Sequence, residues 1–349
     1  MTVDDQLTTA TLKHFVACVA CFCLGFFSLS PGKSLWPFWL GLISGFLVVL
    51  AVGWEQHLGG LEESRRYFFT YLYPQHKDIP PEFLKKMSSN RIFSSLFYPN
   101  ALAGALLLLV PATFAVVWQS RRRLTRSARV FLVVLIGIGA VGCLYWSGSK
   151  GGWLLMLCLG LVALLRLPFG KRLKVGLITA VLLIGLTGFF WKYASFFQKG
   201  ATSVSARFDY WSAALQTTRT RPLFGTGPGT FAIPYQKIKR PESEMARLVH
   251  NDYLQQASDS GLPGFVLYAL FIVGTLVRSF PKRRLQDAAE ASSEDWLAFS
   301  VWLGVLGWSM QGLVEFGLYI PALAWPAFAL MGWLLARTSK RIDKPQAAR

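Results

Sequence analysis

His250 is the side chain of this sequence that is best placed to move a proton. It stands before the segment 251–255 (NDYLQ), which has the pattern of a helix start and leads toward a helix end near Gly261 and Pro263. The positive end of a helix macrodipole disfavours a protonated imidazole, and a neutral imidazole can act as a general base. The alternative interpretation is a loop histidine that only hydrogen-bonds to the backbone.

Two basic residues on the same predicted face could bind an anion. Arg207 lies in segment 206–215, whose apolar residues recur at helical spacing, and we expect it in the first turn of a helix at the membrane surface. Guanidinium and backbone N–H groups would hold an anion there. Lys150 lies in the glycine-rich turn 147–152, at the head of another predicted helix. The alternatives are a simple interfacial anchor for 206–215 and snorkelling of Lys150 to the membrane interface.

Glu315 is the acid that lies deepest within an apolar run, near the outer end of a predicted span. Ionisable residues within membrane segments are functional candidates, because burying a charge in lipid is costly. A basic structural partner is the alternative explanation. Tyr98-Pro99-Asn100 begins another predicted span from the same side, so several polar groups meet one face of the membrane.

Two other patterns are weaker indications of chemistry. Segment 222–231 carries three glycines at alternate positions, but no Gly-Lys-Ser/Thr follows, which favours a rigid re-entrant turn over a nucleotide-binding loop. His14, Cys18 and Cys21 would share one helical face. Zinc needs four convergent ligands, so we expect no metal site, and the five cysteines imply no disulfide framework.

The composition indicates a chain whose apolar surface faces lipid. Of 349 residues, 53% are hydrophobic and 15% are charged, whereas about a quarter of a soluble domain is charged. This composition excludes a disordered chain and argues against a soluble globule. The net charge of +18 does not indicate nucleic-acid binding, because the basic residues lie between apolar runs and not along one stripe with aromatics.

Nine apolar stretches predict an all-α, polytopic membrane bundle that forms a single membrane domain over 1–349. A bilayer core about 30 Å thick requires about 20 mostly apolar residues in a spanning helix. The nine stretches are 12–30, 35–54, 97–118, 130–147, 152–167, 175–191, 263–279, 296–315 and 320–337.

Short basic loops predict the orientation of this bundle. The positive-inside rule places such loops, and with them the C-terminus, in the cytoplasm, so nine spans would leave the N-terminus outside. The two long segments, 55–96 and 192–262, then lie on the outer face. The second has nine basic and five acidic residues, a net charge of +4, and we expect it to be partly helical and to carry the site. The basic residues of the short loops are Arg121, Arg122, Arg123, Arg126, Arg129, Arg166, Lys171, Arg172, Lys174, Arg278, Lys282, Arg283, Arg284, Arg337, Lys340, Arg341 and Lys344.

Five motifs, in this order along the chain, resemble the O-antigen ligase family, which also includes O-antigen polymerases and protein O-oligosaccharyltransferases. The resemblance covers about residues 95–335. The motifs are Tyr98-Pro99-Asn100 with Ala103, Ser149-Lys150-Gly151-Gly152-Trp153, Arg207 through Trp211, Pro222 through Gly227, and His250 through Gln255.

The sequence departs from the family in two ways. Lys150 stands where the family typically has an arginine, which keeps the charge but loses the bidentate geometry. The ligases have about twelve spans with both ends cytoplasmic. Three N-terminal spans would therefore be missing here, in keeping with an outer N-terminus.

The resemblance implies a multi-pass glycosyltransferase of the bacterial inner membrane that acts in lipopolysaccharide biosynthesis. Such an enzyme moves a glycan from undecaprenyl pyrophosphate to an acceptor hydroxyl at a periplasmic site, with inversion and without metal or cofactor. The acceptor hydroxyl could belong to lipid A core, a glycan or a protein. A transporter or flippase is the alternative from another class, but it predicts inverted repeats and polar groups at mid-membrane, which the sequence lacks.

The resemblance also assigns roles to the site residues. His250 would deprotonate the acceptor, and Arg207 and Lys150 would stabilise the pyrophosphate. The remaining polar residues would orient the histidine or the acceptor; these are Asn100, Asn251, Asp252 and Glu315.

Overall fold

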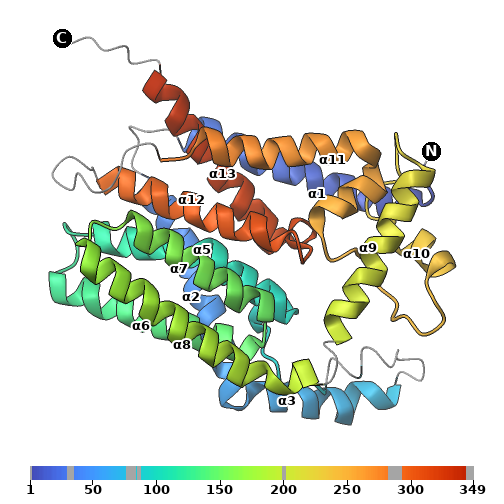
Figure 1. The fold of residues 1–349 in the computed structure, drawn as a ribbon, viewed down its shortest axis with the longest axis horizontal. Coiled ribbons are helices and arrows are strands. Elements are labelled where there is room, and N and C mark those ends of the chain that lie inside the picture. The colour runs from blue at the N-terminus through green and yellow to red at the C-terminus, as the bar shows by residue number, and fades with distance from the viewer. Residues whose placement is uncertain are drawn as a thin grey trace.

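The computed structural model describes residues 2–29, 35–75, 84, 88–198, 202–281 and 293–342. Within these residues every regular element is a helix, which confirms the predicted all-α class (Figure 1). A helix lies at each of the nine predicted spans. They are α1 (Asp5–Cys23, continued by η1, Leu24–Ser28), α2 (Trp36–Glu55), α5 (Pro99–Gln119), α6 (Arg126–Ser147), α7 (Lys150–Arg166), α8 (Lys171–Gln198), α11 (Asp252–Arg278), α12 (Ser293–Gln311) and α13 (Pro321–Ile342).

Six of the described helices are long and apolar enough to cross a membrane. By length and composition they are Asp5–Ser28, Trp36–Gln75, Pro99–Gln119, Arg126–Ser147, Lys171–Gln198 and Asp252–Arg278. The chain is therefore a membrane protein. The helices α7, α12 and α13 fall outside this group, and α7 has only 17 residues, so for these three the crossing stays a prediction.

The helix α5 lies at the centre of the bundle. It is apolar all round, and a helix with no polar face belongs in an interior, where Leu102, Leu106 and Leu107 are fully buried. Small residues allow α12 to approach it closely: a Cβ on Gly304 would lie 2.1 Å from the Leu108 carbonyl oxygen. The peripheral helix α8 has the opposite character, because Ile184 and other apolar side chains on it are exposed and therefore face lipid.

The basic loops and the outer segments lie at opposite ends of the bundle. In Figure 1 the α5–α6 and α7–α8 turns lie at the left end, whereas α9 (Thr202–Thr220) and α10 (Ala232–Ile238) lie at the right end. Spans that cross the membrane in alternating directions predict this arrangement. Which end of the bundle lies in the cytoplasm stays a prediction. Of the basic residues named for the short loops, Lys282, Arg283, Arg284 and Lys344 lie outside the described residues.

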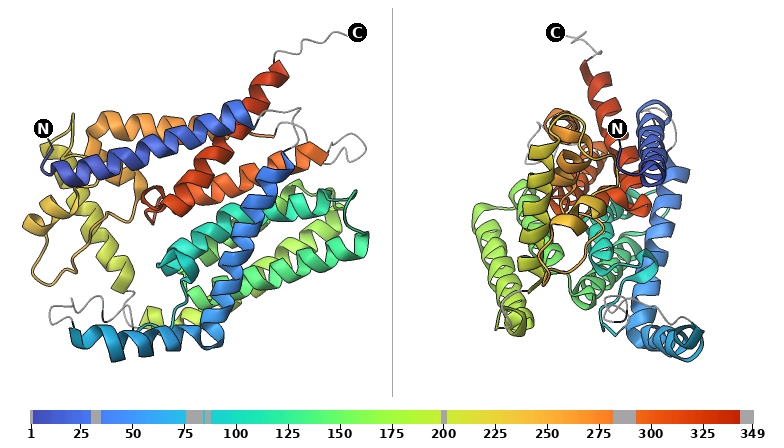
Figure 2. Two further views of the ribbon diagram at one scale, coloured as in Figure 1. Left: turned by 180° about the vertical axis from the view of Figure 1, so that it is seen from behind. Right: turned by 90° about the vertical axis from the view of Figure 1, so that its right-hand side faces the viewer.

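The described parts of the two predicted outer segments are largely helical. Segment 192–262 starts inside α8 and contains α9, α10 and the first part of α11, and α9 and α10 share a small core around Tyr210, Phe231 and Tyr235. In segment 55–96, the non-helical backbone of Gly59 (φ 136°) makes a kink, and the chain changes direction after α2. The helix α3 (Leu61–Tyr67) therefore runs in a different direction from α2 (Figure 2).

Candidate active site

The Glu315 carboxylate is the centre of a polar cluster that joins four distant parts of the chain. Arg207 Nη2 pairs with its Oε1 atom, which also accepts from Asn100 Nδ2. His250 Nδ1 lies 3.3 Å from Oε2, and the Tyr98 hydroxyl donates to the same atom at 3.2 Å. The structure thus brings together Asn100, Arg207, His250 and Glu315 among the residues that the sequence singled out.

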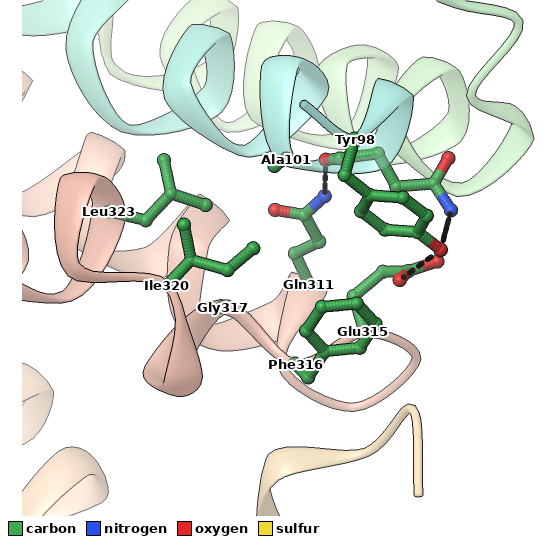
Figure 3. A pocket seen from close by; sticks show the side chains of 9 residues that line it. Tyr98, Ala101, Gln311, Glu315, Phe316, Gly317, Ile320 and Leu323 are labelled. Carbon is green, nitrogen blue, oxygen red and sulfur yellow. Dashed lines mark hydrogen bonds between the residues drawn. The ribbon is translucent and has the colours of Figure 1, made fainter. Parts of the chain in front are cut away.

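Glu315 occupies a turn and not a membrane span. The span predicted for 296–315 is four residues too long, because α12 ends at Gln311. Arg207 Nε fixes the turn by donating to the Val314 carbonyl at 3.0 Å, and Gln311 Nε2 donates to the Asn100 carbonyl at 2.7 Å. Figure 3 shows Tyr98 and Glu315 pointing toward one another beside a small pocket that Gln311 also lines.

Glu315 is ionised at neutral pH although it is only 7% exposed. Burial by itself would raise its pKa. The hydrogen bond from His250 and the charge and hydrogen bond of Arg207 outweigh that effect and lower the pKa below the ordinary value. An ionised carboxylate only accepts hydrogen bonds, so each group around it must offer a proton.

His250 is therefore held as the tautomer with its proton on Nδ1. Its Nε2 atom hydrogen-bonds to nothing in the part of the chain that the structure describes, which leaves that lone pair available. The ring contacts Phe316 edge-on at 4.7 Å and Tyr210 at 5.6 Å between centroids. Its backbone has φ 55°, in the left-handed region, and Trp211 Nε1 donates to its carbonyl at 3.4 Å.

The helix start predicted beyond His250 is present two residues later. Asn251 is the N-cap of α11, accepting from the Tyr253 and Leu254 N–H groups at 3.0 Å. The buried Asp252 accepts from the Leu318 N–H at 3.0 Å, and its own N–H donates to the Gly312 carbonyl. Asn251 thus caps α11, and Asp252 ties the start of this helix to the turn after α12. They position the segments that carry His250 and Glu315, and the described structure shows no hydrogen bond from either to the imidazole.

The expected place of Arg207 in a first helical turn is wrong. The helix α9 covers Thr202–Thr220, because no glycine or proline interrupts the residues before Arg207. Its N–H group is consequently inside the helix and is not free for an anion. The guanidinium instead bonds to the Glu315 carboxylate and to the Val314 and Ser203 carbonyls.

Lys150 stands beside the cluster without a hydrogen bond to it. It begins α7 after Gly148 (φ 62°) and the N-cap Ser149. Its Nζ lies 3.8 Å from the centroid of the Phe196 ring, a cation–π contact. Burial, with the charges of Arg91 and Arg207, lowers the pKa of Lys150 to about 8.

Arg91 is the residue of this cluster that the sequence reasoning missed. Its Nε donates to the Ser147 carbonyl at 2.6 Å and its Nη2 donates to Asn100 Oδ1 at 2.8 Å. Burial lowers its pKa, and the nearby Tyr98 and Glu315 partly offset this effect. No periodic pattern surrounds Arg91; the only signal was a basic residue shortly before Tyr98-Pro99-Asn100.

The glycine-rich segment forms a tight turn that packs on α11. Gly227 N–H donates to the Asp259 carbonyl at 2.8 Å, and Gly229 N–H donates to Asp259 Oδ2 at 2.7 Å. A Cβ on Gly225 would lie 2.4 Å from the Asp259 carbonyl carbon. The turn meets the break in α11 at Gly261 (φ 72°), and its N–H groups are used for this packing and not for a phosphate.

His14 holds the first helix against the last. Its Nε2 lies 2.7 Å from the Leu318 carbonyl, its Nδ1 accepts from Trp325 Nε1 at 3.2 Å, and Cys18 Sγ lies 3.7 Å from Nε2. Among the described residues, no group of three or more His, Cys, Asp and Glu side chains is arranged to hold a metal ion.

Comparison with known proteins locates the resemblance. Residues 137–269 match the family model described as O-antigen ligase. This match confirms the predicted resemblance. The matched segment includes Lys150, Arg207 and His250, whereas Asn100 and Glu315 lie on either side of it. A protein of Haemophilus influenzae described as uncharacterized is 32% identical in a region that covers 36% of this chain and 38% of that protein's length.

Proposed function

We propose that this protein is a membrane glycosyltransferase of the O-antigen ligase type. It moves a glycan from an undecaprenyl pyrophosphate carrier to an acceptor hydroxyl. One observation carries the proposal: Glu315 holds the His250 imidazole by Nδ1 and also binds the Arg207 guanidinium, while Nε2 has no hydrogen bond to any described residue. The family match over 137–269 supports a glycan-transferring enzyme.

His250 is the general base of the proposed reaction. The acceptor O–H gives its proton to Nε2, and the oxygen attacks the anomeric carbon of the glycan. Proton uptake at Nε2 makes the ring an imidazolium, whose charge the Glu315 carboxylate at 3.3 Å stabilises. Asn100 and the Tyr98 hydroxyl hold the carboxylate in place from its other side.

Arg207 and Lys150 stabilise the leaving group. As the new bond forms, the bond between the anomeric carbon and the pyrophosphate oxygen breaks, and its electron pair stays on that oxygen. Cations fixed beside a developing negative charge lower the barrier, so the reaction needs no metal ion. A single displacement from the face opposite the leaving group inverts the anomeric configuration.

The proposed location is the bacterial inner membrane, with the site on the periplasmic face and the C-terminus in the cytoplasm. The position of the basic turns at the end of the bundle away from α9 and α10 supports this orientation. The chain then forms one membrane domain, 1–349, whose periplasmic segments are 55–96 and 192–262. Its partners are membrane lipid, the lipid-linked donor and an acceptor hydroxyl on lipid A core, on a glycan or on a protein.

Transfer of a labelled glycan in proteoliposomes tests this function. Purified protein receives undecaprenyl pyrophosphate-linked, radiolabelled glycan and lipid A core, and the labelled product is measured. We expect transfer by the wild type and a loss of about 10²- to 10⁴-fold in His250→Ala. His57→Ala is the matched control, because the His57 ring stacks on Trp146 at 3.6 Å and takes no part in the Glu315 cluster.

Three results would count against the proposal or change it. Near-normal transfer by His250→Ala would remove the histidine from the reaction. Movement of the lipid-linked glycan across the bilayer without transfer would indicate a transporter or flippase. Transfer to a glycan or a protein hydroxyl, with none to lipid A core, would indicate a polymerase or a protein O-oligosaccharyltransferase.

A further inference from the structure

Arg91 joins two parts of the candidate site that are distant in sequence. Its Nε bond to the Ser147 carbonyl fixes the turn that precedes Lys150, and the stem of its side chain packs on this turn, 3.1–3.4 Å from where a Cβ on Gly148 would lie. Its Nη2 bond to Asn100 Oδ1 fixes the amide whose Nδ2 donates to Glu315. The guanidinium therefore lies between the Lys150 turn and the Glu315 cluster.

The third nitrogen of this guanidinium is unused. Nη1 makes no hydrogen bond in the described part of the chain, and it keeps access to solvent. The fork geometry of a guanidinium fixes the direction of Nη1 once Nε and Nη2 are bound. An anion that reaches Nη1 would thus meet a donor whose orientation is already set.

The charges of the cluster favour an anion with more than one negative charge. Arg91, Arg207 and Lys150 are cations, and Glu315 pairs with only one of them. Arg91 and Arg207 both act on Lys150 by lowering its pKa, which shows that the three charges are close enough to repel one another. A lipid pyrophosphate carries a negative charge on each phosphate and gains another when its bond to the sugar breaks.

We propose that Arg91 is a third donor-binding cation, whose Nη1 contacts the pyrophosphate while Nε and Nη2 hold the Lys150 turn and Asn100. This inference rests on the proposed function, since it assigns the ligand of the same site. Arg91 then distinguishes a diphosphate from a monophosphate, because the second phosphate needs a cation of its own.

Binding of two soluble probes tests the role of Arg91. The affinities of farnesyl diphosphate and farnesyl monophosphate are measured by calorimetry with the full chain in lipid nanodiscs. Losing a charged hydrogen bond costs about tenfold or more in affinity, so Arg91→Gln should weaken diphosphate binding by that factor. Monophosphate binding should change less than about threefold, and Arg91→Lys should regain much of the loss because it keeps the charge.

Arg65→Gln is the matched control for a purely structural effect. Arg65 Nη2 donates to the Ser89 carbonyl and to Asn90 Oδ1, both at 2.6 Å, and so holds the segment that leads into Arg91 without joining the Glu315 cluster. We expect Arg65→Gln to bind the diphosphate like the wild type. If it loses as much affinity as Arg91→Gln, the effect comes from the shape of the segment and the inference is wrong.

The remaining outcomes separate this inference from the proposed function. A wild type that binds neither probe overturns both. If the wild type binds the diphosphate, two results overturn the inference alone. One is an affinity of Arg91→Gln equal to that of the wild type, and the other is an affinity of Arg91→Lys no higher than that of Arg91→Gln. If Arg91→Gln does not fold, Arg91→Lys decides: the preference for diphosphate over monophosphate should survive in it, and loss of that preference overturns the inference.

Discussion

The two oxygens of Glu315 serve two different partners: Oε1 pairs with Arg207, and Oε2 lies 3.3 Å from His250 Nδ1. The carboxylate therefore orients the imidazole and fixes the arginine at once. In the proposed mechanism, a change at Glu315 disturbs the base and the cation together, whereas a change at His250 removes only the base. Mutations of Glu315 and of His250 can therefore distinguish the contributions of these two residues.

Glu315→Gln should lower kcat by about 10²- to 10⁴-fold with a smaller effect on KM, because an amide can donate to Nδ1 and so favour the wrong tautomer. Glycan transfer in proteoliposomes gives both constants. Glu294→Gln is the control, since Glu294 pairs with Arg337 and its side chain is 69% exposed. Full activity of Glu315→Gln would show that the carboxylate does not position the base.

The stability of the wild type should fall in acid because of Glu315. Its pKa is lowered on folding, mainly by the contacts that outweigh its burial, so in acid the unfolded chain binds the proton more readily. This stabilisation is fully present at pH values above the pKa of a glutamate in the unfolded chain, about 4.3. It is lost as the pH falls through the lower pKa that Glu315 has in the folded chain. Unfolding midpoints between pH 3 and 7 should therefore fall more steeply for wild type than for Glu315→Gln, and parallel curves would refute this.

Binding of farnesyl diphosphate should weaken as the pH rises through about 8, the pKa of Lys150 in the empty site. A bound anion favours the charged amine and raises its pKa, so the affinity continues to fall until the pH passes this higher pKa of the complex. Lys150→Arg should abolish the fall, because a guanidinium stays charged. The check is calorimetric titration from pH 7 to 10; an unchanged fall in Lys150→Arg would exclude Lys150 from anion binding.

Gly304→Ala should destabilise the bundle by about 1–3 kcal/mol, because the new Cβ would lie 2.1 Å from the Leu108 carbonyl oxygen. Gly274→Ala is the matched control, since a Cβ there meets nothing within 4 Å. Thermal unfolding followed by tryptophan fluorescence compares the two. Equal midpoints would mean that α12 moves away from α5 at little cost.

Hydropathy predicted the helices, and motif spacing singled out four residues that the structure brings together, but neither predicted the features that depend on tertiary contacts. A run of apolar residues marks α5 and α8 alike, although α5 is central and α8 faces lipid. Glu315 was placed inside a span because the residues around it, from Gly312 to Leu318, are largely apolar although the helix has already ended. Hydropathy identifies residues that avoid water, in a helix or in a buried turn, and so it does not show where a helix ends.

Arg91 could not be predicted because its role depends on the Ser147 carbonyl, which lies 56 positions away in the sequence. The start of α9 was missed for a related reason: the apolar stripe begins at Phe208, while the helix already covers the polar residues from Thr202. Polar helix ends carry no apolar signal. Contacts between loops likewise leave no periodic trace in the sequence.

The backbone of His250 has φ 55°, so the fold is strained at the residue that we propose as the general base. A left-handed conformation costs a non-glycine residue about 1 kcal/mol or more, and glycine adopts it freely. His250→Gly should consequently be inert and more stable than His250→Ala, because both variants lose the ring and its bond to Glu315 but only glycine adopts this backbone freely. Such a variant would retain intact donor and acceptor together, and could be used to capture both molecules side by side.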